Sequence, residues 1–289
     1  MFSIFLKVKK QFRDYLFWRG AKQWYRNWLG KRLNYRHPKN ITEKLMWLSR
    51  YWQDPRKSEY ADKVLVREYV KKCGFEDILL PIYGIWNTAG EIDFDKLPNQ
   101  FVLKCNHGCG YNIICKDKNA LDQNEAKHQL NKWLSEVYGM SYYEIHYAKI
   151  KPLVFCEKYL PSLEKSVIDY KIHCINGEPF CFFVCSDRDD SKNEVVFSSY
   201  SLDWEHLNYL KEEGPENIPK PQNLDRMLKI ANTLSKPFPY IRVDLYEVEG
   251  VVYFGELTFT PHGNIMDYYK DEVLLKMGEL LKLPKKYNG

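Results

Sequence analysis

Two carboxylates near the end of the chain stand where a strand interior is otherwise apolar. Asp244 lies within residues 240–248 and Glu256 within residues 251–258, and a Glu-Gly turn separates the two segments. Burying an unpaired carboxylate is costly, so each acid needs a partner. A hairpin would bring them together in an all-oxygen site suited to a phosphate-bearing magnesium ion. In the alternative interpretation, one acid faces solvent or pairs with Arg242.

A lysine and two glycines form a second candidate site in residues 101–114. Lys104 ends an apolar strand, and Gly108 and Gly110 open the loop that leads into the next strand. Glycine lets backbone N–H groups approach a polyphosphate, and the lysine supplies a point charge. The spacing matches neither a P-loop nor a dinucleotide fingerprint. A tight hairpin with a lysine that reaches solvent explains the same residues, so both interpretations stay open.

A third candidate follows the apolar strand that begins at Val154. Glu157 and Lys158 stand at the end of this strand. They fit a plain strand end. They equally fit a linker whose backbone edge pairs with adenine while Glu157 binds the exocyclic amine or the ribose.

Composition indicates a globular, reduced protein. Aromatic residues make up 16% of the 289 residues, which argues against disorder and allows a sizeable core. No run of eighteen apolar residues suggests a spanning helix, and the first six residues are too short for a signal-peptide core. The eight cysteines contain no C-x-x-C pair and mostly lie in apolar runs. This usage is typical of buried thiols in a cytoplasmic protein.

The N-terminal segment is strongly basic and aromatic. Residues 1–41 hold eleven lysines or arginines against one acid, Asp14, interleaved with Trp, Phe, Tyr and Leu. A basic amphipathic helix with aromatic residues is typical of an interfacial membrane anchor, and each basic residue near anionic lipid contributes about 1 kcal/mol. We therefore expect residues 1–36 to contact an anionic membrane surface. A helix packed on the body or a partner protein remains an alternative; nucleic-acid binding is not expected, because the remaining chain is acidic.

The elements that position these residues mix helices and strands without strict alternation. We expect helices over 41–48, 60–73, 122–138, 224–234 and 267–283. An extended segment over 79–86, strands over 101–116, 152–160, 169–175, 179–185 and 194–198, and the hairpin over 240–258 complete the pattern. This order indicates an α+β arrangement.

The order of the motifs resembles the ATP-grasp superfamily, and within it the TupA-like proteins named for teichuronopeptide biosynthesis. The resemblance runs from about Thr42 to Leu281, and its most specific pieces are residues 61–69, 101–108, 169–171, 242–246 and 254–261. It implies an α+β ATP-grasp fold in which two α+β subdomains enclose ATP, preceded by a helical N-terminal region and a small substrate domain. The implied division is a basic aromatic segment at 1–40, a pre-ATP-grasp region at 41–100 and the ATP-grasp domain at 101–283.

The resemblance also assigns nucleotide-binding roles. It implies that Lys104 contacts the α-phosphate and that Lys171 adds a phosphate contact. The loop over 107–112 would close over the β- and γ-phosphates, through His107, Gly108, Gly110 and Asn112. The linker would bind adenine through the backbone of Lys158 and Leu160, and the amine or ribose through Glu157.

Metal and catalytic roles follow from the same resemblance. Asp244 and Glu256 would hold Mg²⁺, with Thr258 at a third position where many ATP-grasp enzymes have asparagine. Arg242 and Arg188 are candidates to stabilise the transferred phosphoryl group. His262 and His107 flank the site; either is a candidate base for the incoming amine or simply fills a loop.

The family resemblance implies an ATP-dependent carboxylate–amine ligase in bacterial surface-polysaccharide biosynthesis. We expect it to join an amine or amino acid to a carboxylated sugar or glycan through an acyl phosphate, at the inner face of the cytoplasmic membrane. A glycan kinase or a glycosyltransferase of the same pathway is the alternative among enzymes. A non-catalytic scaffold attached to the membrane is the alternative outside them.

Overall fold

The computed structural model describes the backbone of residues 2–160, 168–189 and 194–287, and the side chains of residues 13–160, 168–186 and 196–287. Arg188, one of the two arginines expected to stabilise the phosphoryl group, has its side chain outside the described residues.

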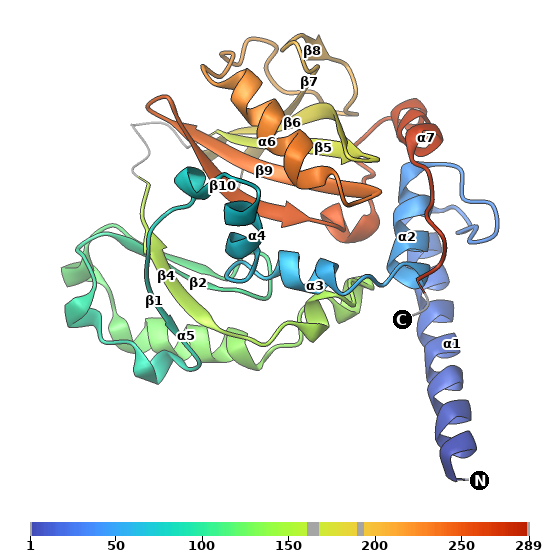
Figure 1. Cartoon of the computed structure of the whole chain (residues 1–289), viewed down its shortest axis with the longest axis horizontal. Helices are drawn as coiled ribbons and strands as arrows, with labels where there is room; N and C mark the ends of the chain where they lie inside the picture. The colour runs from blue at the N-terminus through green and yellow to red at the C-terminus, as the bar shows by residue number, and fades with distance from the viewer. Residues whose placement is uncertain (1, 161–167, 190–193, 288–289) are drawn as a thin grey trace.

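Two antiparallel sheets face each other (Figure 1). The smaller has four strands in the order β1-β4-β2-β3, and the larger has six in the order β10-β9-β5-β6-β7-β8. The smaller sheet comprises β1 (Ile82–Trp86), β4 (Val154–Lys158), β2 (Phe101–Cys105) and β3 (Asn112–Cys115). The larger comprises β10 (Val251–Thr258), β9 (Tyr240–Val248), β5 (Asp169–Ile175), β6 (Glu178–Asp189), β7 (Glu194–Tyr200) and β8 (His206–Leu207).

Each sheet has a helix on its outer face. In Figure 1, α5 (Gln123–Ser135) lies below the smaller sheet and α6 (Leu224–Ser235) above the larger one. Apolar side chains of α5, β2 and β4 form one core, and those of α6 join a second core built on the larger sheet. β1 belongs to the predicted pre-ATP-grasp region but pairs with β4 of the smaller sheet. The inner faces of both sheets are thus left to line a space between them.

The C-terminal hairpin forms as the sequence predicts. Glu249 and Gly250 both have positive φ, 51° and 73°, as a two-residue turn of the I′ type requires. Asp244 pairs with Glu256 across the two strands, next to a β-bulge at Gly255. A Cβ on Gly255 would lie 3.0 Å from the carbonyl oxygen of Asp244, so glycine lets the bulge approach the partner strand closely. The two carboxylates therefore stand opposite each other on the hairpin.

The helical region before the sheets differs from expectation in one place. Here α2 (Ile41–Tyr51) is followed by α3 (Arg56–Ala61) and α4 (Val66–Lys72), where the sequence predicted one helix over 60–73. The side chain of Asp62 accepts hydrogen bonds from the backbone N–H groups of Val64 and Leu65, at 2.8 and 3.2 Å. Such local bonds favour a helix start over a helix interior, which explains the break.

The N-terminal helix packs on the body through its second half. α1 (Phe2–Leu29) buries Trp18, Ala21 and Tyr25, and the hydroxyl of Tyr25 lies 2.8 Å from the hydroxyl of Thr42 on α2. Figure 1 shows α1 at the side of the molecule, with its first residues farthest from the sheets. The packed-helix alternative is therefore correct for this half, and contact of residues 1–36 with a membrane surface stays a prediction.

Helix α7 (Asp271–Leu280) packs against α2 and is the last helix of the described chain. Six of the eight cysteines are buried, as their apolar surroundings predicted. Within the described residues, no helix combines the length and the apolar character needed to cross a bilayer.

Candidate active site

A cavity of about 320 Å³ lies between the two sheets. The smaller sheet and its glycine loop contribute one wall, and β5, β9 and β10 contribute the other. Most of the nucleotide and metal residues predicted from the sequence line it, namely Lys104, Gly108, Gly110, Asn112, Glu157, Lys158, Leu160, Lys171, Asp244 and Glu256. Residues far apart in the chain thus meet in one cavity.

Asp244 is the most enclosed charge of this cavity, with 1% of its side chain exposed. Arg242 donates two parallel hydrogen bonds to Asp244, from Nε to Oδ1 at 2.7 Å and from Nη2 to Oδ2 at 2.6 Å. Lys171 Nζ donates a third, 2.8 Å from Oδ2. The pairing of Asp244 with Arg242, which the sequence left as an alternative to a metal site, therefore occurs. Asp244 nevertheless lines the cavity.

Glu256 carries the second carboxylate. Lys63 Nζ lies 3.3 Å from its Oε2, and Arg242 Nη2 lies 3.6 Å from its Oε1. Thr258 Oγ1 donates a hydrogen bond to Oε1 at 2.9 Å. Burial by itself would raise the pKa of Glu256, but the cations Lys63, Arg242 and Lys171 outweigh it and lower the pKa to about 2. Glu256 is therefore ionised at neutral pH.

Lys171 links this pair to a third acid, Asp169, which also hydrogen-bonds its ammonium group. Burial would lower the pKa of Lys171, but Asp244 and Asp169 outweigh it and raise the pKa. One carboxylate oxygen of Asp169, Oδ1, is buried without a hydrogen-bond partner among the described residues. The site thus holds, beside Lys171, a carboxylate oxygen without a partner in the described part of the chain.

The donor set fits magnesium. Mg²⁺ is usually bound by one or two carboxylates together with phosphate oxygens and water. Asp244 and Glu256 supply the carboxylates on opposed strands, and Thr258 supplies a hydroxyl beside Glu256. Among the described residues no group of three or more His, Cys, Asp or Glu side chains could hold a metal alone. A metal here would therefore need oxygen donors from phosphate.

The opposite wall is centred on Lys104 of β2 and Glu157 of β4. The two strands are neighbours, and Lys104 Nζ forms an ion pair with Glu157 Oε1 at 2.5 Å. A β2–β3 hairpin with a partly exposed lysine is indeed present. The lysine nevertheless lines the cavity together with its carboxylate partner.

Hydrogen bonds of the Asn106 side chain anchor the start of the loop between β2 and β3. Its amide donates to Asp62 Oδ2 at 2.8 Å and to the carbonyl of Lys151 at 3.1 Å, and it accepts from the N–H of Leu153 at 2.7 Å. The side chain is fully buried. Asn106 therefore fixes the start of the loop to the α3–α4 break and to the segment that leads into β4.

Glycine is required at two loop positions. A Cβ on Gly108 would lie 2.7 Å from the ring of Tyr111, and Gly110 has a positive φ of 75°. The carbonyl of Gly108 accepts a hydrogen bond from Lys63 Nζ at 2.6 Å, so the same lysine contacts the loop and Glu256. The loop is thereby tied to the carboxylate hairpin across the cavity.

His107 lies away from the cavity that the other predicted residues of its loop line. Its side chain is buried, Nε2 lies 3.1 Å from the carbonyl of Trp133 on α5, and the ring packs near Tyr111. Burial lowers the pKa of His107, so the ring is neutral at pH 7. His107 does not line the cavity between the sheets. In this geometry it holds the loop against α5.

A second, larger cavity of about 810 Å³ adjoins the first. Cys109, Lys171 and Glu256 line both cavities, so the two meet at the cation–carboxylate cluster, in which Arg242 lies 3.6 Å from Glu256. We call the larger one the aromatic chamber, because its walls include Trp24, Trp28, Tyr138, Tyr142, Tyr147, Phe183, Phe197 and Tyr268. Thr258 and His262 line this chamber rather than the smaller cavity. His262 Nδ1 lies 3.5 Å from Asp267 Oδ1.

Three sets of residues at the two cavities were not predicted from the sequence. Lys63 stands in a segment that resembles the family, but no role was assigned to it. Glu144 lies in the chamber, hydrogen-bonded to Thr260, and burial raises its pKa to about 7. The tryptophans of α1 were expected to face lipid, whereas Trp28 Nε1 donates to Asp267 at 3.0 Å at the chamber wall. A basic aromatic sequence pattern does not distinguish a helix face that meets lipid from one that packs against the protein.

Comparison with known protein families matches residues 43–282 to the TupA-like ATP-grasp family. No curated protein matches the chain. Among solved structures, a D-alanine–D-alanine ligase from Bacillus anthracis complexed with ATP aligns at 14% identity and a TM-score of 0.49, over 78% of this chain and 66% of that one. The corresponding ligase from Helicobacter pylori aligns at 16% identity and 0.44, over 79% and 60%. The ATP-grasp ligase PsnB, complexed with a minimal precursor, Mg and ADP, aligns at 12% and 0.41, over 84% and 67%.

This chain thus spans two thirds or less of the length of the two D-alanine–D-alanine ligases. The family match covers most of the chain, from α2 to the segment after α7. The two facing α+β layers with a charged cavity between them agree with the predicted ATP-grasp fold. The chain belongs to the TupA-like ATP-grasp family.

Proposed function

We propose that the protein is an ATP-dependent carboxylate–amine ligase. The observation that carries the proposal is the meeting of two cavities at Lys171 and Glu256, with Arg242 3.6 Å from Glu256 on the side of the larger cavity. One cavity has the charges that a nucleotide and its metal need, and the other has room for an acceptor. When bound, MgATP supplies the phosphoryl group that activates a carboxylate as an acyl phosphate, and attack by an amine then releases phosphate.

The residues of the smaller cavity position the nucleotide in this proposal. Lys104 and Lys171 face the phosphates from opposite walls, and the loop with Gly108 and Gly110 offers backbone N–H groups. Asp244 and Glu256 hold Mg²⁺ with Thr258 beside them. Glu157 and the 158–160 linker take the adenosine end. Arg242 then exchanges part of its pairing with Asp244 for the transferred phosphoryl group.

The aromatic chamber takes the acceptor carboxylate and the amine. Phosphoryl transfer depends mostly on positioning and charge neutralisation, and Arg242 stands where the chamber meets the nucleotide cavity. Among the titratable residues that line the chamber, we propose His262 and Glu144 as candidates to accept a proton from the amine. Arg188 stays a candidate for charge stabilisation from the sequence alone.

We propose a carboxylated sugar or glycan of a bacterial surface polysaccharide as the acceptor. The family resemblance supports this class, and the many aromatic rings of the chamber suit the apolar faces of sugar rings. The basic N-terminal segment supports a cytoplasmic location at the inner face of the membrane, where such precursors are made.

Product analysis tests the reaction. The protein is incubated with MgATP, an amino-acid mixture and an extract of glycan precursors from cells that lack it. A ligase gives ADP and free phosphate with amine consumed. ADP with phosphate retained on the glycan indicates a kinase instead, and unconsumed ATP with a transferred sugar indicates a glycosyltransferase. If the protein is a ligase, Glu256→Gln should abolish product. Glu125→Gln on α5 is the surface control and should form product as the wild type does.

A scaffold role is tested in cells. Under the ligase proposal, Asp244→Asn removes the amide-linked amino acid from the surface glycan, although the variant protein is present at normal level. Normal glycan from cells that carry this variant would contradict an enzymatic role.

A further inference from the structure

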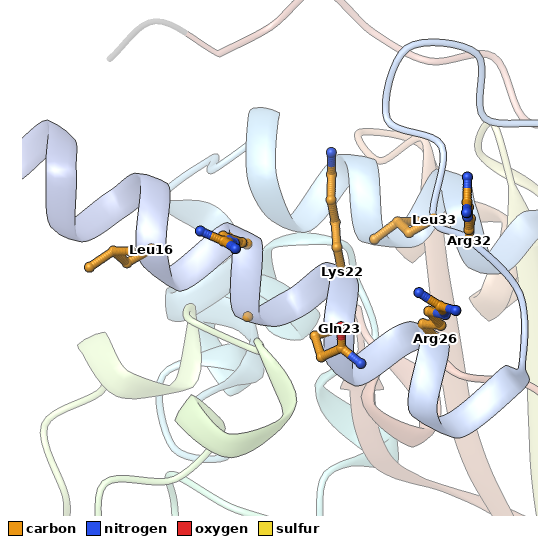
Figure 2. A pocket seen from close by; sticks show the side chains of 8 residues that line it. Leu16, Lys22, Gln23, Arg26, Arg32 and Leu33 are labelled. Carbon is orange, nitrogen blue, oxygen red and sulfur yellow. The ribbon is translucent and has the colours of Figure 1, made fainter.

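A third cavity, of about 630 Å³, lies along α1 and the residues that follow it (Figure 2). We call it the basic groove. Its walls come from α1 and from the residues that directly follow the helix, and they are Leu16, Arg19, Gly20, Lys22, Gln23, Arg26, Arg32 and Leu33. Four of these eight side chains are cationic, and none is acidic.

The fold builds this groove in two steps. Arg19, Lys22 and Arg26 are spaced by three and four residues, so they share one side of the helix. The chain then turns back at Gly30, whose φ is 66° and whose N–H donates to the carbonyl of Arg26 at 2.9 Å. This reversal brings Arg32 beside the helix and buries Leu33, as Figure 2 shows for the side chains around Arg26.

The charges of the groove lack counter-ions within the described part of the chain. No ion pair joins Arg19, Lys22, Arg26 or Arg32 to a described carboxylate; Lys22 lies over the ring of Tyr35, with Nζ 5.7 Å from the centroid. The adjacent Lys31 behaves differently, because its Nζ lies 2.8 Å from Asp271 Oδ2. Four like charges around one hollow repel each other, so an anion in the groove would relieve that repulsion.

We propose that the basic groove binds the phosphate headgroup of an anionic membrane lipid. Guanidinium groups bind phosphate oxygens in a bidentate way, and Arg26 and Arg32 stand on the same groove to do so. Leu16, 46% exposed, offers an apolar contact beside the cations, as an acyl chain near a headgroup requires. The proposal rests on the proposed membrane location and does not depend on the ligase reaction.

Vesicle binding by the full chain tests the groove. Wild-type protein should sediment with phosphatidylcholine vesicles that contain phosphatidylglycerol, and not with pure phosphatidylcholine. Arg26→Gln with Arg32→Gln should weaken binding by about 30-fold, since each cation near an anionic surface contributes roughly fivefold. Lys116→Gln with Lys132→Gln, two exposed residues beside or on α5, is the matched control and should bind as wild type does.

A charge-preserving variant separates a phosphate site from diffuse attraction. Arg26→Lys with Arg32→Lys keeps the charge but loses bidentate geometry, so headgroup binding should still weaken several-fold. Inorganic phosphate that replaces chloride at constant ionic strength should compete with the vesicles. Unchanged binding by the lysine variant, together with no competition, would overturn the groove and leave only a charged surface.

The remaining outcomes also decide. If wild type does not bind the anionic vesicles, both the groove and the membrane location are wrong. If wild type binds and the glutamine pair binds equally well, the groove is wrong and the membrane location stands. Thermal unfolding with MgATP, unchanged in all variants, shows that neither result reflects a misfolded protein or a damaged nucleotide site.

Discussion

At the scale of single residues, the sequence predicts which side chains meet in the cavity best where a side chain contradicts its surroundings. An acid inside an apolar strand needs a reason, and for Asp244 and Glu256 the reason is visible in the sequence. Lys63 and Glu144 are different, because their partners lie far away in the chain. Glu144 bonds Thr260 across 116 residues, and nothing near it in the sequence signals that contact. The neighbours of His107 in sequence suggest a phosphate loop, but its contact with the carbonyl of Trp133 on α5 cannot be predicted from those neighbours.

Glu144 predicts a pH-dependent stability. Burial raises its pKa from 4.5 to about 7, so the folded state prefers the protonated carboxyl. This contribution is fully present below about pH 4.5 and is lost as the pH rises through 7. Compared with Glu144→Gln, the wild type should lose roughly 3 kcal/mol of unfolding free energy between pH 5 and pH 8. Urea titrations at both pH values measure this, with Glu125→Gln as the exposed control. A pH-independent difference would contradict it.

Lys63 predicts a loss of nucleotide affinity. It joins Glu256 to the carbonyl of Gly108, so Lys63→Met should loosen the glycine loop and raise the pKa of Glu256. A charge-assisted hydrogen bond contributes about 1.5–3 kcal/mol, which corresponds to at least a tenfold weaker binding of MgATP. Isothermal titration calorimetry checks this against Lys72→Met, an exposed residue of α4. Equal affinities for both variants would remove Lys63 from the site.

At the scale of elements, local patterns predict most helices and strands, and the hairpin turn follows from Glu249-Gly250. Sheet order does not follow from such patterns. Strand β4 lies between β1 and β2, although a helix and a long connection separate it from both in the chain. The break between α3 and α4 also escaped prediction: Asp62 accepts the local bonds from Val64 and Leu65 that favour it, but the bond that fixes the Asp62 side chain comes from Asn106 in another element.

Asn106→Ala should therefore destabilise several elements at once. It removes a buried amide and leaves Asp62 and the carbonyl of Lys151 without that donor. Unsatisfied buried groups cost about 1–3 kcal/mol each, so we expect a loss of roughly 2–5 kcal/mol. Chemical denaturation measures it, with Asn119→Ala on the surface as the control. A loss below 1 kcal/mol would mean that the loop is held by other contacts.

At the scale of the whole molecule, α1 is the part that family membership explains least. It precedes the matched residues 43–282, yet its second half lies in the main core, and two of its tryptophans, Trp24 and Trp28, line the aromatic chamber. Sequence periodicity identified a basic aromatic helix but gave no sign of which side would meet the body. A single helix can thus contribute to the core, the chamber and the basic groove.

Trp18→Ala tests the structural role of α1 separately from any membrane contact. Truncating a buried tryptophan costs about 3–5 kcal/mol, so the melting temperature of the whole protein should fall in one cooperative transition. Tyr15→Ala, with a 56% exposed side chain, should leave it unchanged. Equal melting temperatures for the two variants would show that α1 is not part of the core in solution.

The central claim is that the two sheets bind MgATP at the Asp244–Glu256 hairpin. Calorimetric titration of the full chain with ATP, with and without magnesium, tests it most directly. We predict one saturable site per chain that strengthens with magnesium, and an Asp244→Asn variant that folds but loses the magnesium-dependent part. Absence of ATP binding by the folded wild-type protein, or equal magnesium-dependent binding by Asp244→Asn, would contradict the claim.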